Sequence, residues 1–407
     1  MIDVNTLKNI LIRQKDEIPR LLAKPFTKRH SYVQAQKLMP LESIKVIIGP
    51  RRAGKSTFAI NLIQAYDFIY INFDELELSE LTSHSTLDDA LESVYGKNPR
   101  HIFVDEIQNL YKFELWLNSL QRRGYNVLAT GSNANLLSSE LSTHLTGRYA
   151  EIEILPFSYK EYGGDFNRFY NLGGFPEILL NGQDKESYAT ILQDSIILKD
   201  VVKRYNIRHY DKILSIYNYL SSTVASLFSY KNIAEAVKLK SEHTVRKYIQ
   251  YLGNTYLHYE LLPFSQKTKE FYRSNKKSYV VDNAFIRNNS LSPNSSKFLE
   301  NFVFTELIKS RLKPNKNLFY YKSVRGFEVD FLVKKDLQVH MAIQVCYEFT
   351  NLETRERELR ALVDVYKEFG VTQLYVVTMN HREDVVVQGV QVKVLPAVDF
   401  LQDVLYG

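Results

Sequence analysis

The feature that most constrains this chain is a glycine-rich loop that directly follows an apolar run. The run Ile44–Ile48 continues into Gly49, and the loop closes on Gly54, Lys55 and Ser56. Glycines let backbone N–H groups curl around phosphate oxygens, and the start of the next helix favours negative charge. The spacing predicts a strand, a phosphate-binding loop and a helix. The residues expected to surround a nucleotide are Gly49, Pro50, Arg51, Arg52, Ala53, Gly54, Lys55, Ser56 and Thr57.

A pair of acids at the end of a later apolar run supports this interpretation. The run Ile102–Val104 ends in Asp105 and Glu106. Within a P-loop protein, Lys55 reaches the β- and γ-phosphates and the Ser56 hydroxyl binds Mg²⁺. The first acid then holds Mg²⁺ through water, and the second orients the attacking water. The competing interpretation is a chance glycine-rich turn, which would not need these acids. The sequence therefore predicts ATP and Mg²⁺ as cofactors, Ser56 and Asp105 as the metal ligands, and ATP hydrolysis.

Two further polar positions are candidates for catalysis. Ser132 follows the apolar run that ends near Ala129, where it could contact the γ-phosphate, with Asn133 as the alternate. A plain strand-ending turn would explain the same residues. Arg148 comes after the next helical stretch and could stabilise charge on the γ-phosphate of a neighbouring subunit. A surface salt bridge is the other explanation for this arginine.

The region around these motifs has the pattern of a parallel sheet. Short apolar, β-branched runs alternate with stretches long enough for crossover helices. Strands buried on both faces give such continuous apolar runs. The fold class predicted is α/β with a parallel sheet, and the expected strands are residues 44–48, 68–73, 101–104, 126–129 and 151–155.

The motifs together resemble a family of archaeal and bacterial AAA-superfamily ATPases, and they cover about half of the chain in the right order. The resemblance implies an AAA+ core with a helical lid, an oligomeric ring that is most simply a hexamer, and a role for Arg148 as an arginine finger acting in trans. The segments that carry it are residues 49–56, 104–108, 130–133, 141–148, 156–162, 173–177 and 198–205.

The remaining sequence divides into further segments. A short helix, a turn and a longer helix, followed by two β-like segments, outline a winged helix-turn-helix. After a polar linker at 290–296, the helix and strand order matches the restriction-endonuclease-like fold shared by archaeal Holliday-junction resolvases. The predicted domains are an AAA+ core at 1–155, a helical lid at 156–222, a winged helix-turn-helix at 223–289 and a restriction-endonuclease-like domain at 290–407.

The second helix of the winged segment has a basic side. Lys240 precedes it, and His243, Arg246 and Lys247 lie opposite its apolar positions, as in a helix that enters DNA. Residues 229–280 hold ten Lys and Arg against four acids, which suits a polyanion partner. Packing against neighbouring subunits is the open alternative.

The C-terminal segment has an incomplete nuclease signature. Asp330 supplies the first acid of such a site, and Glu306 could assist it. Gln344 and Cys346 stand where a second carboxylate and a lysine are needed to hold Mg²⁺ and steer water. The sequence predicts a site that does not cut. A DNA-binding module and a purely structural or oligomerising domain remain equal alternatives.

Composition limits the protein class. The 407 residues include one cysteine, which excludes an internal disulfide, and no apolar run approaches the length of a membrane span. We expect a cytoplasmic protein that does not enter a membrane.

The function expected is an oligomeric ATPase that couples ATP hydrolysis to binding and remodelling of DNA, branched DNA included, or to movement along it. The alternative is a nucleotide-switched signalling or scaffold ATPase that binds proteins. A weaker third reading is a nuclease that uses Asp330 and Glu306.

Overall fold

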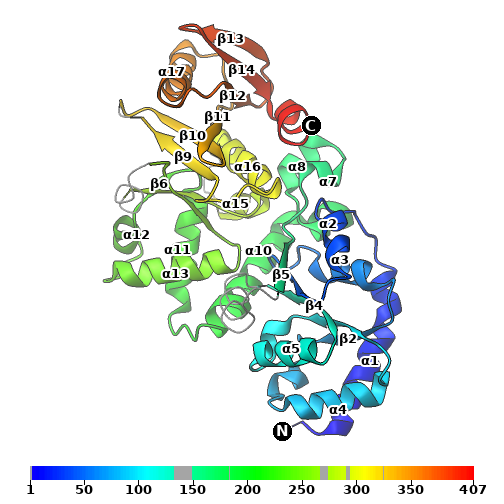
Figure 1. The fold of residues 1–407 in the computed structure, drawn as a ribbon. Coiled ribbons are helices and arrows are strands. Elements are labelled where there is room, and N and C mark those ends of the chain that lie inside the picture. The colour runs from blue at the N-terminus through cyan, green and yellow to red at the C-terminus, as the bar shows by residue number, and fades with distance from the viewer. Residues whose placement is uncertain (1, 133–148, 183, 266–273, 290–293, 324) are drawn as a thin grey trace. The chain divides into compact units, whose positions relative to one another are not determined.

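The computed structural model describes residues 2–132, 149–182, 184–265, 274–289, 294–323 and 325–407 (Figure 1). The chain folds into two compact units, residues 1–155 and 156–407. None of the helices in the described ranges combines the length and the apolar composition that crossing a membrane requires.

The first unit contains a five-stranded sheet in the order β2-β3-β4-β1-β5. Every neighbouring pair of strands is parallel, which confirms the predicted α/β class. The middle residues of the strands are buried because helices cover both faces. The strands are β1 (Ile44–Ile48), β2 (Phe68–Asn72), β3 (His101–Asp105), β4 (Asn126–Gly131) and β5 (Tyr149–Glu153).

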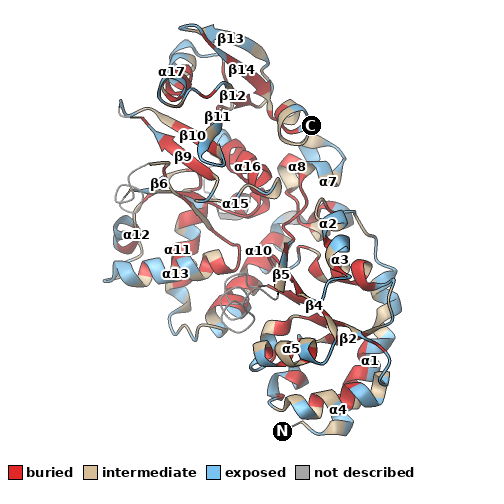
Figure 2. Ribbon diagram, in the orientation of Figure 1, coloured by how far each residue is buried: buried red, intermediate tan, exposed pale blue. Residues whose placement is uncertain are grey.

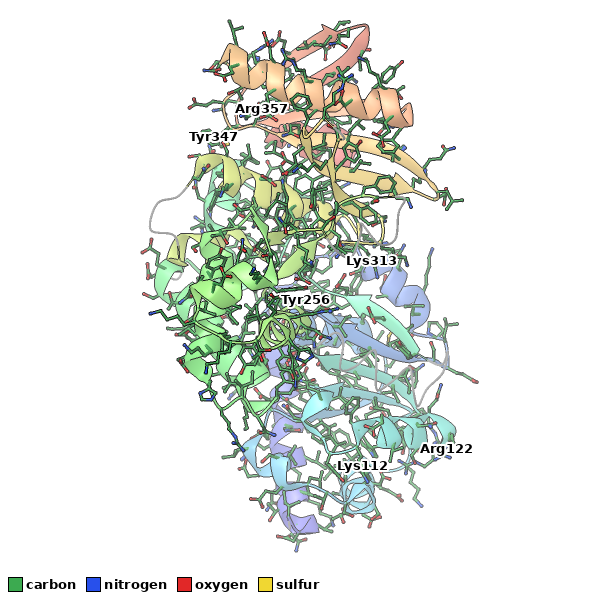
Figure 3. The ribbon with its side chains drawn as sticks, turned by 90° about the vertical axis from the view of Figure 1, so that its left-hand side faces the viewer. Lys112, Arg122, Tyr256, Lys313, Tyr347 and Arg357 are labelled. Atoms are coloured by element: carbon green, nitrogen blue, oxygen red, sulfur yellow. The ribbon has the colours of Figure 1, made fainter. Side chains whose placement is uncertain are left out.

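Alternate strand residues face different sets of helices. On β1, Val46 packs in one cluster with residues of α1, α4 and α5, whereas Ile47 packs in another with α2 and α3. The helix α5 extends from its N-cap Lys112 to Arg122, both labelled in Figure 3. The helices are α1 (Val4–Leu22), α2 (Tyr32–Leu38), α3 (Lys55–Ile63), α4 (His84–Tyr95) and α5 (Phe113–Arg122), with 3-10 turns η1 (Leu76–Glu80) and η2 (Ile107–Asn109).

The second unit begins with helices that a double glycine interrupts. Gly173 has a φ of 81°, and a Cβ there would lie 1.7 Å from a carboxylate oxygen of Asp282, so only glycine fits. The same carboxylate accepts a 2.8 Å hydrogen bond from the backbone N–H of Gly174. The elements are α7 (Tyr159–Tyr162), α8 (Phe166–Leu172), α9 (Pro176–Asn181), α10 (Lys185–Ser195), the π-helix η3 (Ile196–Lys203) and α11 (Tyr210–Ser222).

A small antiparallel sheet, β6-β8-β7, follows with a helix pair beside it. On the second helix of the pair, Val245, Ile249 and Leu252 are buried, as their spacing predicts. The two-residue strand β6 was not expected. The elements are β6 (Leu227–Phe228), α12 (Tyr230–Ala236), α13 (Glu242–Asn254), β7 (Tyr259–Leu261), β8 (Lys276–Tyr279) and α15 (Asn283–Asn289).

The C-terminal part of the second unit is built on a six-stranded mixed sheet in the order β13-β14-β12-β11-β10-β9. Figure 2 shows buried residues along β10 and α16. The helix α16 begins at Ser295, inside the expected linker, because Asn294 caps its first N–H groups. The elements are α16 (Ser295–Lys309), β9 (Leu318–Lys322), β10 (Glu328–Lys335), β11 (Gln338–Val345), α17 (Leu352–Phe369), β12 (Gln373–Thr378), β13 (Glu383–Val387), β14 (Val390–Pro396), α18 (Ala397–Asp399) and η4 (Phe400–Leu405).

Candidate nucleotide-binding site

The glycine-rich loop joins β1 to α3, and its glycines are required by the backbone. Gly49 has a φ of 149°, and a Cβ there would lie 1.9 Å from the carbonyl oxygen of Ile154. Gly54 caps α3 in the left-handed region with a φ of 93°. Backbone of this shape can direct several N–H groups toward one anion at the start of a helix.

The two residues that end the loop lie at the start of α3. Lys55 is buried, and its ammonium donates a 3.0 Å hydrogen bond to the carbonyl oxygen of Pro50. The ammonium therefore lies against the loop itself. The Ser56 hydroxyl donates to Oδ1 of Asp105 at 3.0 Å. The contact brings the predicted metal ligands together across the gap between α3 and the end of β3.

A residue on the neighbouring strand holds the two acids in place. The Thr130 hydroxyl donates to Oδ1 of Asp105 and accepts a 3.0 Å hydrogen bond from the backbone N–H of Glu106. Asp105 is buried, and burial, followed by the charge of Glu106, raises its pKa to about 6. A buried carboxylate whose protonation is favoured in this way is suited to a cationic ligand, which would restore its charged form.

Glu106 has an unusual backbone conformation. Its φ and ψ are 52° and 45°, in the left-handed region that costs a non-glycine residue about 1–2 kcal/mol. Its carboxylate accepts a hydrogen bond from the Gln108 amide, and the same amide nitrogen lies 3.3 Å from the Ser132 hydroxyl. The structure thus places Ser132 and Glu106 on the same side of the loop, bridged by Gln108.

Two of the predicted residues are not among those described. Arg148 and its role as an arginine finger lie outside the described residues, and so does Asn133, the alternate to Ser132. Sequence reasoning also missed Thr130 and Gln108 as site residues, although both stand inside the motifs it used. Each could have been found by asking which polar residues flank the acids on the same or the adjacent strand end.

The residues present fit a magnesium nucleotide. A serine hydroxyl and a carboxylate are hard oxygen donors of the kind Mg²⁺ prefers. They lie beside a loop whose glycine backbone suits phosphate, with a buried ammonium next to it. Arg51 lies 3.8 Å from a carboxylate oxygen of Asp74, at the turn after β2. The geometry supports binding of a nucleoside triphosphate in the first unit.

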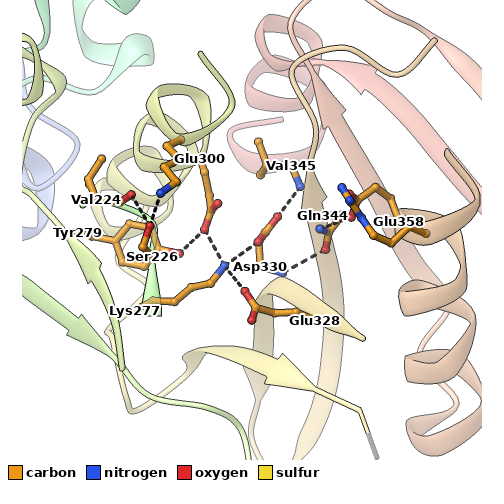
Figure 4. A network of polar contacts seen from close by, with 12 residues as sticks. Val224, Ser226, Lys277, Tyr279, Glu300, Glu328, Asp330, Gln344, Val345 and Glu358 are labelled. Atoms are coloured by element: carbon orange, nitrogen blue, oxygen red, sulfur yellow. Dashed lines mark hydrogen bonds and ion pairs between the residues drawn. The ribbon is translucent and has the colours of Figure 1, made fainter. Parts of the chain in front are cut away.

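The predicted nuclease residues in the second unit are only partly brought together. The backbone N–H of Asp330 donates to Oε1 of Gln344 at 3.2 Å (Figure 4). The Cys346 thiol donates to the carbonyl of Glu348, and burial raises its pKa to about 11, so it stays neutral. A neutral thiol cannot serve as the steering cation.

Glu306 does not take the place expected beside Asp330. Its carboxylate is buried and contacts Lys309, the backbone N–H of Tyr159 and the hydroxyl of Tyr406. Glu300 lies near Asp330 instead. The two glutamates are six residues apart on α16, so their side chains point about 120° apart around its axis and do not face the same site. The expectation of an assisting Glu306 is therefore not met.

The predicted DNA-contacting residues form one exposed face. His243, Arg246 and Lys247 are exposed on α13, and Lys240 is exposed just before it. The ring of Tyr251, one turn after Lys247, stacks on Tyr205 at 3.6 Å, and the Lys247 ammonium lies 5.8 Å from the centre of that ring. The face is free of the apolar residues that pack the helix.

The comparisons with known proteins agree with the nucleotide-binding site described in the first unit. Residues 41–163 match the model of an AAA domain. Residues 163–295 and 295–399 match two domains of unknown function, DUF8612 and DUF4143. The parallel sheet, the glycine-rich loop and the paired acids, together with this match, define a P-loop protein with an AAA domain.

Relatives extend the likeness over most of the chain. The uncharacterized protein MJ1544 of Methanocaldococcus jannaschii is 35% identical over 379 residues, which cover 84% of this chain and 83% of that protein. The chain belongs to the same family as this archaeal protein. An uncharacterized protein of Haemophilus influenzae is 27% identical over 387 residues, covering 87% of this chain and 95% of its own length. Among solved structures, the Walker-type ATPase paby2304 of Pyrococcus abyssi is similar at 15% identity and a TM-score of 0.44, covering 66% of this chain and 99% of that one.

Proposed function

We propose that this protein is an ATPase that binds ATP with Mg²⁺ in its first unit. The observation that carries the proposal is the 3.0 Å contact between the Ser56 hydroxyl and Asp105, at the mouth of the glycine-rich loop. Two hard oxygen donors that meet beside a phosphate-binding loop have few uses other than holding a metal-bound nucleotide.

The chain's own residues have separable roles in hydrolysis. Lys55, released from the carbonyl of Pro50, binds the terminal phosphates, and Ser56 and Asp105 hold the metal position. When bound, Mg²⁺ neutralises charge on the phosphates. Glu106 orients and polarises the attacking water, and Ser132 contacts the γ-phosphate. Gln108 must give up part of its hold on Glu106 as the water enters.

The proposed catalytic unit is an oligomer, most simply a hexameric ring. In this arrangement Arg148 of one subunit stabilises transition-state charge in the site of its neighbour. Mixing an Arg148→Ala variant with a Lys55→Ala variant tests the idea. Partial recovery of activity requires the arginine to act in trans. No recovery, with normal assembly, contradicts this role.

We further propose that hydrolysis drives binding and remodelling of DNA, or movement along it. The exposed basic face of α13 supports this, because it has the exposure and charge of a DNA-contacting helix. In this proposal residues 156–222 act as a helical lid and residues 223–289 as a winged helix. Residues 290–407 act as a restriction-endonuclease-like module that binds DNA, branched DNA included, without cutting it.

The test is ATP turnover measured with no DNA and with linear, forked and four-way DNA, for the wild type and for Glu106→Gln. We expect DNA to raise the rate of the wild type. We expect the variant to bind ATP with unchanged affinity but to hydrolyse it about 10²–10⁴ times more slowly, because a general base is removed. If none of the DNA substrates changes the rate of ATP turnover, the proposed role in DNA remodelling is wrong, and a signalling or scaffold ATPase remains.

A further inference from the structure

A lysine ammonium lies at the point where three carboxylates converge in the second unit (Figure 4). The Nζ atom of Lys277 is 2.7 Å from Asp330, 2.8 Å from Glu300 and 2.8 Å from Glu328. The Lys277 side chain is 3% exposed, so these contacts are shielded from water. A lysine this deeply buried is seldom found without such pairing.

The four residues come from three separate elements. Lys277 lies on β8 of the three-stranded sheet, Glu300 on α16, and Glu328 and Asp330 on β10 of the six-stranded sheet. The side chain of Lys277 therefore extends from the three-stranded sheet to the carboxylates of Glu328 and Asp330 on the six-stranded sheet. It joins the sheet beside α12 and α13 to the sheet that carries the predicted nuclease residues.

The charges of the cluster are not balanced by lysine alone. Three carboxylates face one ammonium, and the Tyr279 hydroxyl donates a 2.6 Å hydrogen bond to Glu300. Burial would lower the pKa of Lys277, yet Asp330 and Glu300 raise it well above its usual value. Burial and Asp330 raise the pKa of Glu300 to about 7. The three carboxylates thus favour a cation at their centre, and the single positive charge of Lys277 balances their negative charge only in part.

The second carboxylate oxygen and the backbone N–H of Asp330 are also engaged. Oδ2 of Asp330 accepts a 2.9 Å hydrogen bond from the backbone N–H of Val345. Gln344, which accepts from Asp330, donates in turn to Glu358 at 2.5 Å. Glu358 forms an ion pair with Arg357, which lies on the exposed side of α17 and is labelled in Figure 3. Asp330 is therefore fixed from both sides.

We propose that Lys277 is an internal cation that takes the place of a divalent metal ion among Glu300, Glu328 and Asp330. In this position it closes the acidic site to phosphodiesters and locks the three-stranded sheet to the six-stranded sheet. Metal-dependent cleavage requires a cation that exchanges ligands and binds phosphate. A buried ammonium that donates hydrogen bonds to Glu300 and Asp330 and forms an ion pair with Glu328 can do neither.

The distances suit this substitution. Oxygen ligands lie 2.3–2.6 Å from Ca²⁺ and about 2.0–2.1 Å from Mg²⁺. The three carboxylates already lie 2.7–2.8 Å from a single point. Once the ammonium is removed, a contraction of about 0.1–0.5 Å would bring them onto Ca²⁺, and one of about 0.6–0.8 Å onto Mg²⁺. Among the described residues, no group of three His, Cys, Asp or Glu side chains, these three carboxylates included, is arranged as it stands to hold a metal ion.

The experiment removes the ammonium and asks whether a divalent ion replaces it. The full chain is used without nucleotide, with Asp105→Asn in every sample so that the nucleotide site lacks its acidic metal ligand. Parent and Lys277→Ala proteins are titrated with Mn²⁺ and, separately, with Ca²⁺. Bound Mn²⁺ is counted by electron paramagnetic resonance, and thermal unfolding is followed in both titrations.

We expect the Lys277→Ala protein to bind one Mn²⁺ per chain and the parent to bind none at this site. At a hundredfold excess over Kd, the melting temperature of Lys277→Ala should rise by about 5 °C or more. Adding Asp330→Asn should abolish the gain. Lys277→Arg, which keeps a cation, should behave as the parent does.

Three results would overturn the proposal. The first is a Lys277→Ala protein that folds but binds no more metal than the parent. The second is a parent that binds Mn²⁺ at a site removed by Asp330→Asn. The third is failure of both Lys277→Ala and Lys277→Gln to fold even when Mn²⁺ is present during purification, because the proposal requires the metal to replace the ammonium.

Discussion

The hydroxyl of Ser56 donates a hydrogen bond to Oδ1 of Asp105 across 3.0 Å. Ser56 is the second residue of α3 and Asp105 is the last residue of β3, so neither is near the other in the sequence. They meet because β1 and β3 both pair with β4 in the same direction, which brings their carboxyl ends to one edge of the sheet.

This contact leads to a first prediction. Ser56→Ala removes one oxygen ligand and should lower kcat for ATP by about a hundredfold, since the metal no longer has its position fixed. Nucleotide binding measured with EDTA should be unchanged, whereas the increment that Mg²⁺ adds should disappear. Ser79→Ala, which removes a hydroxyl in η1, is the matched control and should retain wild-type turnover. An unaffected Mg²⁺ increment in Ser56→Ala would rule out Ser56 as a ligand.

A second prediction concerns Thr130. Thr130→Val keeps the shape but leaves Oδ1 of Asp105 with one donor fewer and the N–H of Glu106 without its acceptor. We expect turnover to fall about 10–100-fold, as for other partners of metal ligands, and stability to fall by about 1–3 kcal/mol. Thr130→Ser restores the hydroxyl and should recover most of both. Steady-state ATPase assays and urea unfolding measure the two effects. If serine does not rescue turnover, the hydroxyl is not the cause.

A third prediction is a pH dependence of stability in the second unit. His258 is buried, and burial lowers its pKa from 6.5 to about 3. The unfolded chain therefore binds a proton below pH 6.5 that the folded chain does not, so stability falls as pH decreases from 6.5 toward 3. The loss reaches about 2 kcal/mol at pH 5, at roughly 1.4 kcal/mol per pH unit.

Urea unfolding of the full chain at pH 7.5 and pH 5 measures this contribution. His258→Gln, whose amide can still reach the Ser278 hydroxyl, should reduce the difference between the two pH values. His340→Gln changes an exposed histidine and should leave the difference unchanged. Equal pH dependence in the His258→Gln and wild-type proteins would contradict the assignment.

A fourth prediction concerns α13. The double variant Arg246→Ala, Lys247→Ala should weaken DNA binding and reduce the slope of log affinity against log salt by about 1–2, because up to two phosphate contacts are lost. Fluorescence anisotropy at several salt concentrations gives both values. Lys367→Ala, at an exposed lysine of α17, should match the wild type. A slope that the double variant leaves intact would place any DNA contact elsewhere.

The sequence predicted most of the first unit because its signals are local. A β-branched run, a glycine-rich loop and a helix follow each other directly, and their pattern does not depend on distant residues. The strand β13 was missed for a different reason. Glu383–Val387 joins β14 through Gln388 and Gly389, both with positive φ. A two-residue turn of this kind between valine runs is a hairpin signal that could have been used.

The parts of the site that sequence reasoning did not reach depend on contacts between distant segments. Thr130 meets Asp105 only because β4 pairs with β3 in a particular register. Lys277 meets Asp330 only because two sheets of the second unit lie together around α16. The lysine that pairs with Asp330 lies neither on β10 nor on its neighbours β9 and β11, but on β8, 53 positions earlier. Such long-range pairing has no periodic signature along the chain.

The left-handed backbone at Glu106 has a consequence for how the protein can be changed. Glycine adopts this conformation without penalty and asparagine with a small one, so Glu106→Gly or Glu106→Asn is expected to relieve part of the strain. Selection for stability alone would favour glycine or asparagine at position 106. Glutamate at this position therefore lowers the stability of the first unit in exchange for ATP hydrolysis. Variants that lose hydrolysis through Glu106→Gly or Glu106→Asn should accordingly have higher melting temperatures than the wild type.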